Sequence, residues 1–168
     1  MITKRAKSTR VVIAFALALA LVLSMGTAAF ASDPDPEGAY DATLYKYGTY
    51  GTTAQAISMG DPALNSADYD ASTGELVIYV QSMVAYGQTG HILNIRIDLD
   101  GDGEYDIEGT PEPPLPDFPT TITFEGLDDL DLSEVLNVEF SIHVGNGPIP
   151  EHPTYTKADL VLTPVSAS

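Results

Sequence analysis

The sequence predicts an all-β protein: an immunoglobulin-like antiparallel β-sandwich of seven or eight strands with one short 3₁₀ turn. Three observations lead to this prediction. Apolar and polar residues alternate along most segments after residue 37, which is typical of half-buried strands. Turn-forming residues interrupt these segments about every ten positions, as in sandwich folds. After the first 31 residues, no segment shows a long apolar repeat of the helical kind.

The strand pattern recurs in eight segments along the chain. They are residues 38–47, 66–70, 75–84, 92–98, 105–108, 120–124, 137–144 and 155–162. The dipeptides Thr73-Gly74 and Asn146-Gly147 suit the turns between them, because Gly adopts a positive φ without a Cβ clash. This punctuation gives short antiparallel strands joined by tight connections.

Two connecting segments have a distinct character. Residues 131–136 are expected to form one short helical turn, with Asp131 or Ser133 near its N-cap. Residues 110–119 contain five prolines, which predict a stiff, exposed connection between the two halves of the sandwich.

The N-terminus predicts a removable secretory signal over residues 1–31. A basic stretch at 4–10 precedes the apolar run 11–23, and a small-x-small cleavage site follows at 29–31. The apolar run is shorter than the roughly 20 residues that a membrane-spanning helix needs. We therefore expect a protein that is secreted or held non-covalently at the cell surface, with no membrane insertion after the signal is cleaved.

The rest of the chain is expected to be a short acidic, Pro-containing tail at 32–37 and one β-sandwich domain at 38–164. The composition is strongly acidic, with 24 Asp and Glu against 7 Lys and Arg and a net charge of −17. Such a charge repels nucleic acid and anionic membranes, so cations or basic protein surfaces are the favoured partners. Solubility in a salty or acidic habitat is the alternative explanation. Cys is absent, so stability must come from packing, with or without a bound ion.

An Asp-rich loop is the first candidate site. Asp98, Asp100, Asp102 and Asp106 occupy positions 1, 3, 5 and 9 of a loop with Gly at position 6. This spacing wraps oxygen ligands around a hard cation, as in the first part of an EF-hand loop. Position 12 is Gly109 and both flanks are predicted strands, so this is not an EF-hand. We expect a structural Ca²⁺ site in a hairpin loop; the alternative is a solvated Asp-Gly turn.

A second set of segments runs through the whole predicted domain. It includes an aromatic strand, a turn that carries Ser58-Met59, and a strand that opens with Gly and then alternates. The matching segments are 40–45, 58–59, 63–64, 74–80, 90–92, 138–144 and 155–162. Together they resemble the near-iron-transporter (NEAT) domain of Gram-positive surface proteins. The resemblance covers nearly all of the chain after the predicted signal.

The resemblance implies a haem carrier, or a domain that interacts with haem-carrying proteins, in iron acquisition. In haem-binding members the turn Ser contacts a propionate, and a Tyr-x-x-x-Tyr on the last strand supplies the iron ligand and its partner. Ser58 and Met59 match the turn, and Tyr155 matches the second Tyr. The first Tyr position holds Glu151, so another side chain must bind the iron. The candidates are Met59, His143 and His152.

The residues leave other roles open. Met59 also suits a gap-filling core position, and His143 alternates with apolar neighbours, so it is expected to point with the polar face toward solvent. His152 lies in a Pro-flanked loop that forms either a binding rim or only a turn. No recognisable catalytic triad, phosphate loop or catalytic zinc motif is present, so we do not expect an enzyme. The alternative function is a calcium-stabilised adhesion or structural module whose Tyr-rich rim contacts protein or glycan.

Overall fold

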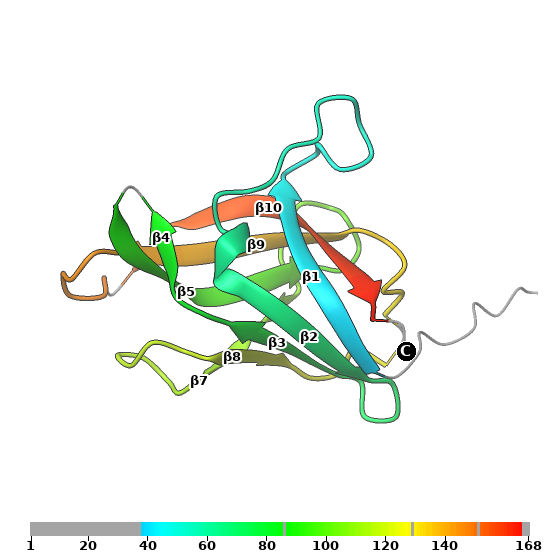
Figure 1. The fold of residues 1–168 in the computed structure, drawn as a ribbon. Coiled ribbons are helices and arrows are strands. Elements are labelled where there is room, and N and C mark those ends of the chain that lie inside the picture. The colour runs from blue at the N-terminus through cyan, green and yellow to red at the C-terminus, as the bar shows by residue number, and fades with distance from the viewer. Residues whose placement is uncertain (1–37, 86, 129, 151, 166–168) are drawn as a thin grey trace, which may run out of the picture. The chain divides into compact units, whose positions relative to one another are not determined.

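The computed structural model describes residues 38–85, 87–128, 130–150 and 152–165, and these form an antiparallel all-β structure (Figure 1). The predicted signal at 1–31, the tail at 32–37 and Glu151 lie outside the described residues. The strands are β1 (Gly38–Lys46), β2 (Leu64–Asp70), β3 (Glu75–Val80), β4 (Met83–Ala85), β5 (Gln88–Asp98), β6 (Ile107–Glu108), β7 (Thr110–Glu112), β8 (Thr121–Phe124), β9 (Leu136–Val144) and β10 (Tyr155–Pro164). Within the described part of the chain, no helix is long and apolar enough to cross a membrane.

The strands follow the order β4-β5-β9-β10-β1-β2-β3-β8-β7, and β6 pairs with β5 (Figure 1). Only Gly109 separates β6 from β7. Ile107 pairs with Ile97 of β5, whereas Pro111 pairs with Ile122 of β8. The segment 107–112 therefore connects strands near the two ends of the sheet path. The two halves of the sheet enclose one core, which confirms the predicted all-β sandwich class, while its immunoglobulin-like arrangement stays a prediction.

The core contains apolar side chains from both halves of the sheet. Its largest fully buried members are Tyr40, Phe124, Phe140, Leu44, Leu76, Ile78, Ile92, Ile95, Ile97, Ile122 and Leu160. Buried and partly exposed residues alternate along β3 and β8, as the period-two pattern predicts. Burial of this apolar surface supplies the main stabilisation in a chain without Cys.

Most predicted strands agree with the structure to within a few residues, with two exceptions. The predicted strand 75–84 is split into β3 and β4 after Val80. The Pro-rich connection begins with β7, which the sequence did not predict. Pro111 has no N–H and cannot donate a hydrogen bond to a neighbouring strand. It is tolerated here because β7 is the last strand of the sheet path.

Two predictions concerned turns of helical type. The predicted 3₁₀ turn is confirmed, as η1 (Asp61–Ala63), with Pro at its start. Of the helical turn predicted at 131–136, the structure shows a single hydrogen-bonded turn, in which Glu134 N donates to Asp131 O (3.3 Å), and no helix before β9 begins at Leu136. The Asp131 carboxylate accepts hydrogen bonds from Ser133 N (3.0 Å) and Oγ (2.6 Å), which stabilises a local Asx turn instead of a helix.

Gly109 provides a test of the connection between the two halves. A Cβ at this position would lie 2.8 Å from Phe124 Cζ and would also clash with Ile122, both fully buried. We expect Gly109→Ala to destabilise the protein by about 1–3 kcal/mol through overpacking, measured by urea unfolding. Gly147→Ala is the control, since a Cβ there has nothing within 4 Å. Equal unfolding midpoints for the two variants would contradict the close approach at Gly109.

Candidate functional sites

The Ser58-Met59 turn lies in the loop that leads from β1 to η1. Ser58 is buried, its N–H donates to Leu44 O (2.8 Å), and its hydroxyl oxygen accepts from Gly60 N (3.4 Å). Met59 is 49% exposed, so it does not fill the core as the alternative interpretation supposed. The turn thus fixes Ser58 through its backbone and presents Met59 to solvent.

The turn and the predicted C-terminal haem contacts lie on different faces of β9. A Cβ on Gly60 would come within 2.5 Å of the Phe140 ring, which belongs to the core. The next residue, Ser141, pairs with Tyr155 and points to the outer face, as does His143. The described residues predicted to contact haem are therefore not gathered around one cavity. Haem binding stays a prediction.

The outer face near His143 is covered by an aromatic ring from the Pro-rich segment. Phe118 stacks on His91 with ring centroids 3.8 Å apart, and its centroid lies 5.7 Å from that of His143. His143 does point away from the core, but the expected exposure to solvent is wrong, because it is only 7% exposed. Burial, with the neighbouring His143, lowers the pKa of His91 below its ordinary value.

A bulge in β5 adds an apolar side chain to this outer face. Ile92 pairs with Ile142 and Asn94 pairs with Ser141, so Leu93 is the extra residue between them. A bulge re-aims side chains locally. Leu93 is fully buried yet lies outside the main core cluster. It lines an outer-face pocket of about 430 Å³, together with Asn94, Arg96, Glu108, Leu115, Ser141, His152, Pro153 and Tyr155.

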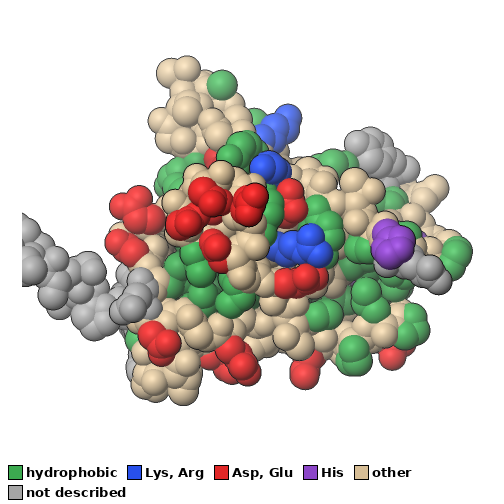
Figure 2. All heavy atoms as spheres, turned by 180° about the vertical axis from the view of Figure 1, so that it is seen from behind, with side chains coloured by type: hydrophobic (Ala, Val, Ile, Leu, Met, Phe, Trp, Pro, Cys, Tyr) green, Lys and Arg blue, Asp and Glu red, His purple; other side chains and the backbone are tan. Residues whose placement is uncertain are grey.

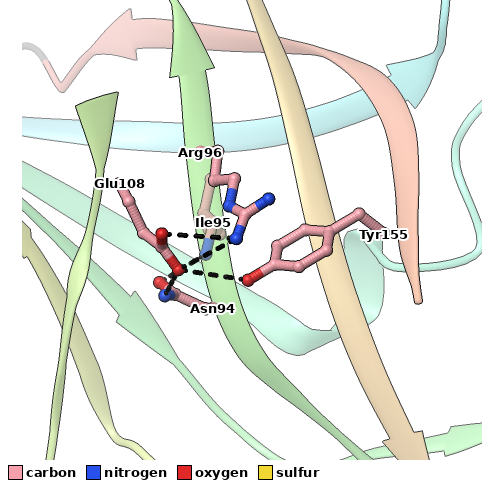
Figure 3. A network of polar contacts seen from close by, with 5 residues as sticks. All are labelled: Asn94, Ile95, Arg96, Glu108 and Tyr155. Carbon is pink, nitrogen blue, oxygen red and sulfur yellow. Dashed lines mark hydrogen bonds and ion pairs between the residues drawn. The ribbon is translucent and has the colours of Figure 1, made fainter. Parts of the chain in front are cut away.

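Glu108 is the centre of a polar network beside this pocket (Figure 3). Its Oε1 accepts hydrogen bonds from Asn94 Nδ2 (2.8 Å), Tyr155 OH (3.2 Å) and Arg96 Nη2 (3.4 Å). The Arg96 guanidinium carbon lies 3.9 Å from the centroid of the Tyr155 ring. Burial raises the pKa of the Tyr155 phenol, and the Glu108 charge adds to this shift while Arg96 opposes it. Tyr155 is therefore a neutral hydrogen-bond donor at neutral pH.

Of the predicted haem contacts, this pocket brings together Tyr155 and the exposed His152. Sequence reasoning missed Asn94, Arg96 and Glu108. A signal was present, because Asn94 and Arg96 alternate with apolar residues in a strand and so share one outward face. Their partner Glu108 comes from a separate strand, and strand pairing was not predicted.

The Asp-rich loop connects β5 to β6. Oxygen atoms of Asp98, Asp100 and Asp106 lie within 4.8 Å of one another, an arrangement that can hold a metal ion. Asp98 is buried, and the other two are exposed. Asp102, the fourth predicted ligand, is not part of this cluster, and its Oδ1 accepts a hydrogen bond from Glu104 N (2.7 Å). Three of the four predicted ligands are thus close together.

Backbone N–H groups hold the carboxylates of this loop. Asp98 Oδ1 accepts from Gly101 N (2.7 Å) and Asp98 Oδ2 from Gly103 N (3.0 Å). Asp106 Oδ2 accepts from Leu99 N (2.7 Å), which joins the two sides of the hairpin. Gly101 and Gly103 have φ values of 75° and 91°, which other residues rarely adopt. The loop is therefore folded around the Asp98 side chain.

The loop borders a cleft whose surroundings are acidic. The cleft has a volume of about 560 Å³ and is lined by residues 98–101, 126–128, 130–131 and 134–137, which contribute the carboxylates of Asp98, Asp100, Asp128, Asp131 and Glu134. Figure 2 shows acidic side chains spread over one face, with basic side chains confined to a small part of it. Such a surface attracts cations.

Tyr105 lies close to the base of the same loop. Burial raises its pKa to about 12, and the charge and hydrogen bond of Glu139 add to the shift. Lys157 Nζ lies 5.5 Å from the ring centroids of both Tyr105 and Tyr47. Tyr105 therefore remains protonated at neutral pH and adds no further negative charge next to Asp98.

Comparisons with family models, with curated proteins and with solved structures found no match for this chain. The NEAT resemblance accordingly stays a prediction.

Proposed function

We propose that this chain is a non-catalytic, extracellular β-sandwich module that binds Ca²⁺ in the loop between β5 and β6. One observation carries the proposal: oxygens of Asp98, Asp100 and Asp106 all lie within 4.8 Å of one another. Three carboxylates at this separation repel one another unless a cation lies between them. The binding of a cation converts this repulsion into a stabilising interaction.

The donor set favours calcium over a transition metal. All three side chains offer carboxylate oxygens, which are hard ligands, and the chain has no Cys. Ca²⁺ takes 6–8 oxygen ligands in flexible geometry and accepts water and backbone carbonyls as the remainder. Mg²⁺ demands a near-ideal octahedron and holds its own water more tightly. The two exposed carboxylates leave room for such additional ligands.

The site suits a structural role. Asp98 ends β5, and Asp106 directly precedes β6, so a cation held by both closes the open end of this hairpin. Because β6 leads into β7 through Gly109, the same hairpin connects the two halves of the sheet. A bound cation therefore stabilises the connection on which the sandwich depends.

The first test is thermal unfolding of the purified protein in EDTA, in CaCl₂ and in MgCl₂. An ion that binds only the folded state adds about 2.7 kcal/mol at a concentration 100-fold above its Kd. We expect this to raise Tm by roughly 5–15 °C in CaCl₂ and by less in MgCl₂. NaCl at matched ionic strength is the control for screening. The same Tm in CaCl₂ and in NaCl would refute the cation site.

Two carboxylates of the loop form a matched pair for mutation. Asp100 and Asp102 are both exposed, and each accepts one hydrogen bond from the backbone N–H two residues later. Only Asp100 belongs to the cluster. We expect Asp100→Asn to weaken calcium binding by about tenfold or more, the equivalent of one lost charged ligand at about 1.4 kcal/mol, as measured by isothermal titration calorimetry. Asp102→Asn is expected to change the Kd by less than about threefold. Equal losses in the two variants would contradict the observed geometry and favour the four-ligand loop.

A further inference from the structure

Three buried side-chain atoms in the described part of the chain have no hydrogen-bond partner: Arg96 Nε, Ser141 Oγ and His143 Nε2. All three belong to β5 or β9 and lie on the outer face of the sheet. A buried polar atom without a partner is destabilising, and most native structures avoid it. The three atoms share one face of the sheet, and this face therefore carries polar groups that make no hydrogen bond.

Two of these atoms belong to residues that line the 430 Å³ pocket, Arg96 and Ser141. Ser141 is fully buried and lies opposite Tyr155 in the pairing of β9 with β10. The Tyr155 ring also stacks on the Arg96 guanidinium. The ring thus covers both groups. Its hydroxyl donates to Glu108 (3.2 Å), and the neighbouring Ser141 hydroxyl lowers the pKa of the Tyr155 phenol, against the larger effect of burial, so a ligand must displace the ring to reach either group.

The unpaired groups define the chemistry of a ligand. Arg96 Nε only donates a hydrogen bond, whereas the Ser141 hydroxyl both donates and accepts. Glu108 is about half exposed and only accepts. A ligand with neighbouring hydroxyl groups satisfies all three, since each hydroxyl donates one hydrogen bond and accepts others.

Charge excludes ionic ligands. The one Arg of the pocket is already paired with Glu108, whose Oε2 lies 3.3 Å from Arg96 Nη2. An anion therefore meets the Glu108 carboxylate and a chain of net charge −17, and a cation meets Arg96. The apolar side chains of Leu93, Leu115 and Pro153 complete the lining and suit the C–H surface of a ring. The volume lies within the range of small-molecule pockets.

We infer that this pocket binds an uncharged sugar ring, whose hydroxyl groups accept from Arg96 Nε, exchange hydrogen bonds with the Ser141 hydroxyl and donate to the Glu108 carboxylate. The Tyr155 ring moves aside as the ligand enters. This inference does not rest on the proposed calcium site, because none of the residues that line the pocket belongs to the Asp-rich loop.

The test is a titration of the ¹⁵N-labelled purified protein with neutral methyl hexopyranosides and N-acetylhexosamines, followed by ¹H–¹⁵N NMR. The chain has three Arg residues, Arg5, Arg10 and Arg96, so the Arg96 Nε–H signal can be assigned by its loss in Arg96→Lys. We expect at least one sugar to shift this signal saturably, with acetate and sulfate at matched concentration causing no saturable shift.

The variant Ser141→Ala distinguishes an effect on sugar binding from an effect on protein stability. Removing an unpaired buried hydroxyl is expected to leave the melting temperature unchanged or raised, while sugar binding weakens by about three- to tenfold through one lost hydrogen bond. Thr156→Ala is the control, because Thr156 neighbours Tyr155 in β10 but pairs with Phe140 and points to the other face. We expect wild-type binding in this variant.

Three outcomes would overturn the inference. The first is no saturable shift of the Arg96 signal with any sugar of the panel. The second is a saturable shift with acetate or sulfate alone, which would assign an anion site instead. The third is an unchanged sugar affinity in Ser141→Ala, which would place the sugar elsewhere on the protein.

Discussion

The close packing at Gly109 is the constraint on which the rest of the structure depends. The Gly109 N–H donates to Ile95 O (2.9 Å), and the position that a Cβ would occupy is filled by the side chains of Ile122 and Phe124. A residue without Cβ therefore allows the chain to leave β5 and reach β8 within a few positions. Because Glu108 directly precedes Gly109, the same constraint places the Glu108 carboxylate beside Arg96 and Tyr155. The fold and the outer-face pocket thus share one cause.

Charge is the second organising factor, and the structure manages it locally. Buried Asp159 accepts hydrogen bonds from the N–H groups of Gly48, Thr49 and Tyr50, which fixes the loop after β1. Asp98 does the same for its own loop, and Glu108 collects three side-chain donors. Around Asp98, by contrast, three carboxylates bring oxygen atoms within 4.8 Å of one another.

The sequence predicts the parts of this protein that depend on local pattern. Period-two alternation located most strands, and the predicted 3₁₀ turn is present as η1. The sequence did not predict the features that depend on pairing between distant strands. Strand register determines three such features, and no local pattern reveals it. They are the bulge at Leu93, the edge position of β7, and the location of Ser58 and Tyr155 against opposite faces of β9. In the Asp-rich loop, spacing suggested four ligands, and only backbone geometry separated Asp102 from the others.

The two candidate sites are physically connected through one hairpin. Asp98 terminates the strand that carries Asn94 and Arg96, and Asp106 directly precedes the strand that carries Glu108. The Ile97–Ile107 and Arg96–Glu108 pairs join these strands in register. A cation that holds Asp98 to Asp106 therefore also holds Arg96 beside Glu108, although it touches neither. This coupling between the two sites requires no movement between the halves of the domain. The strand β6 has only two residues and little stability of its own, so its pairing with β5 depends on the interactions that close the Asp-rich loop.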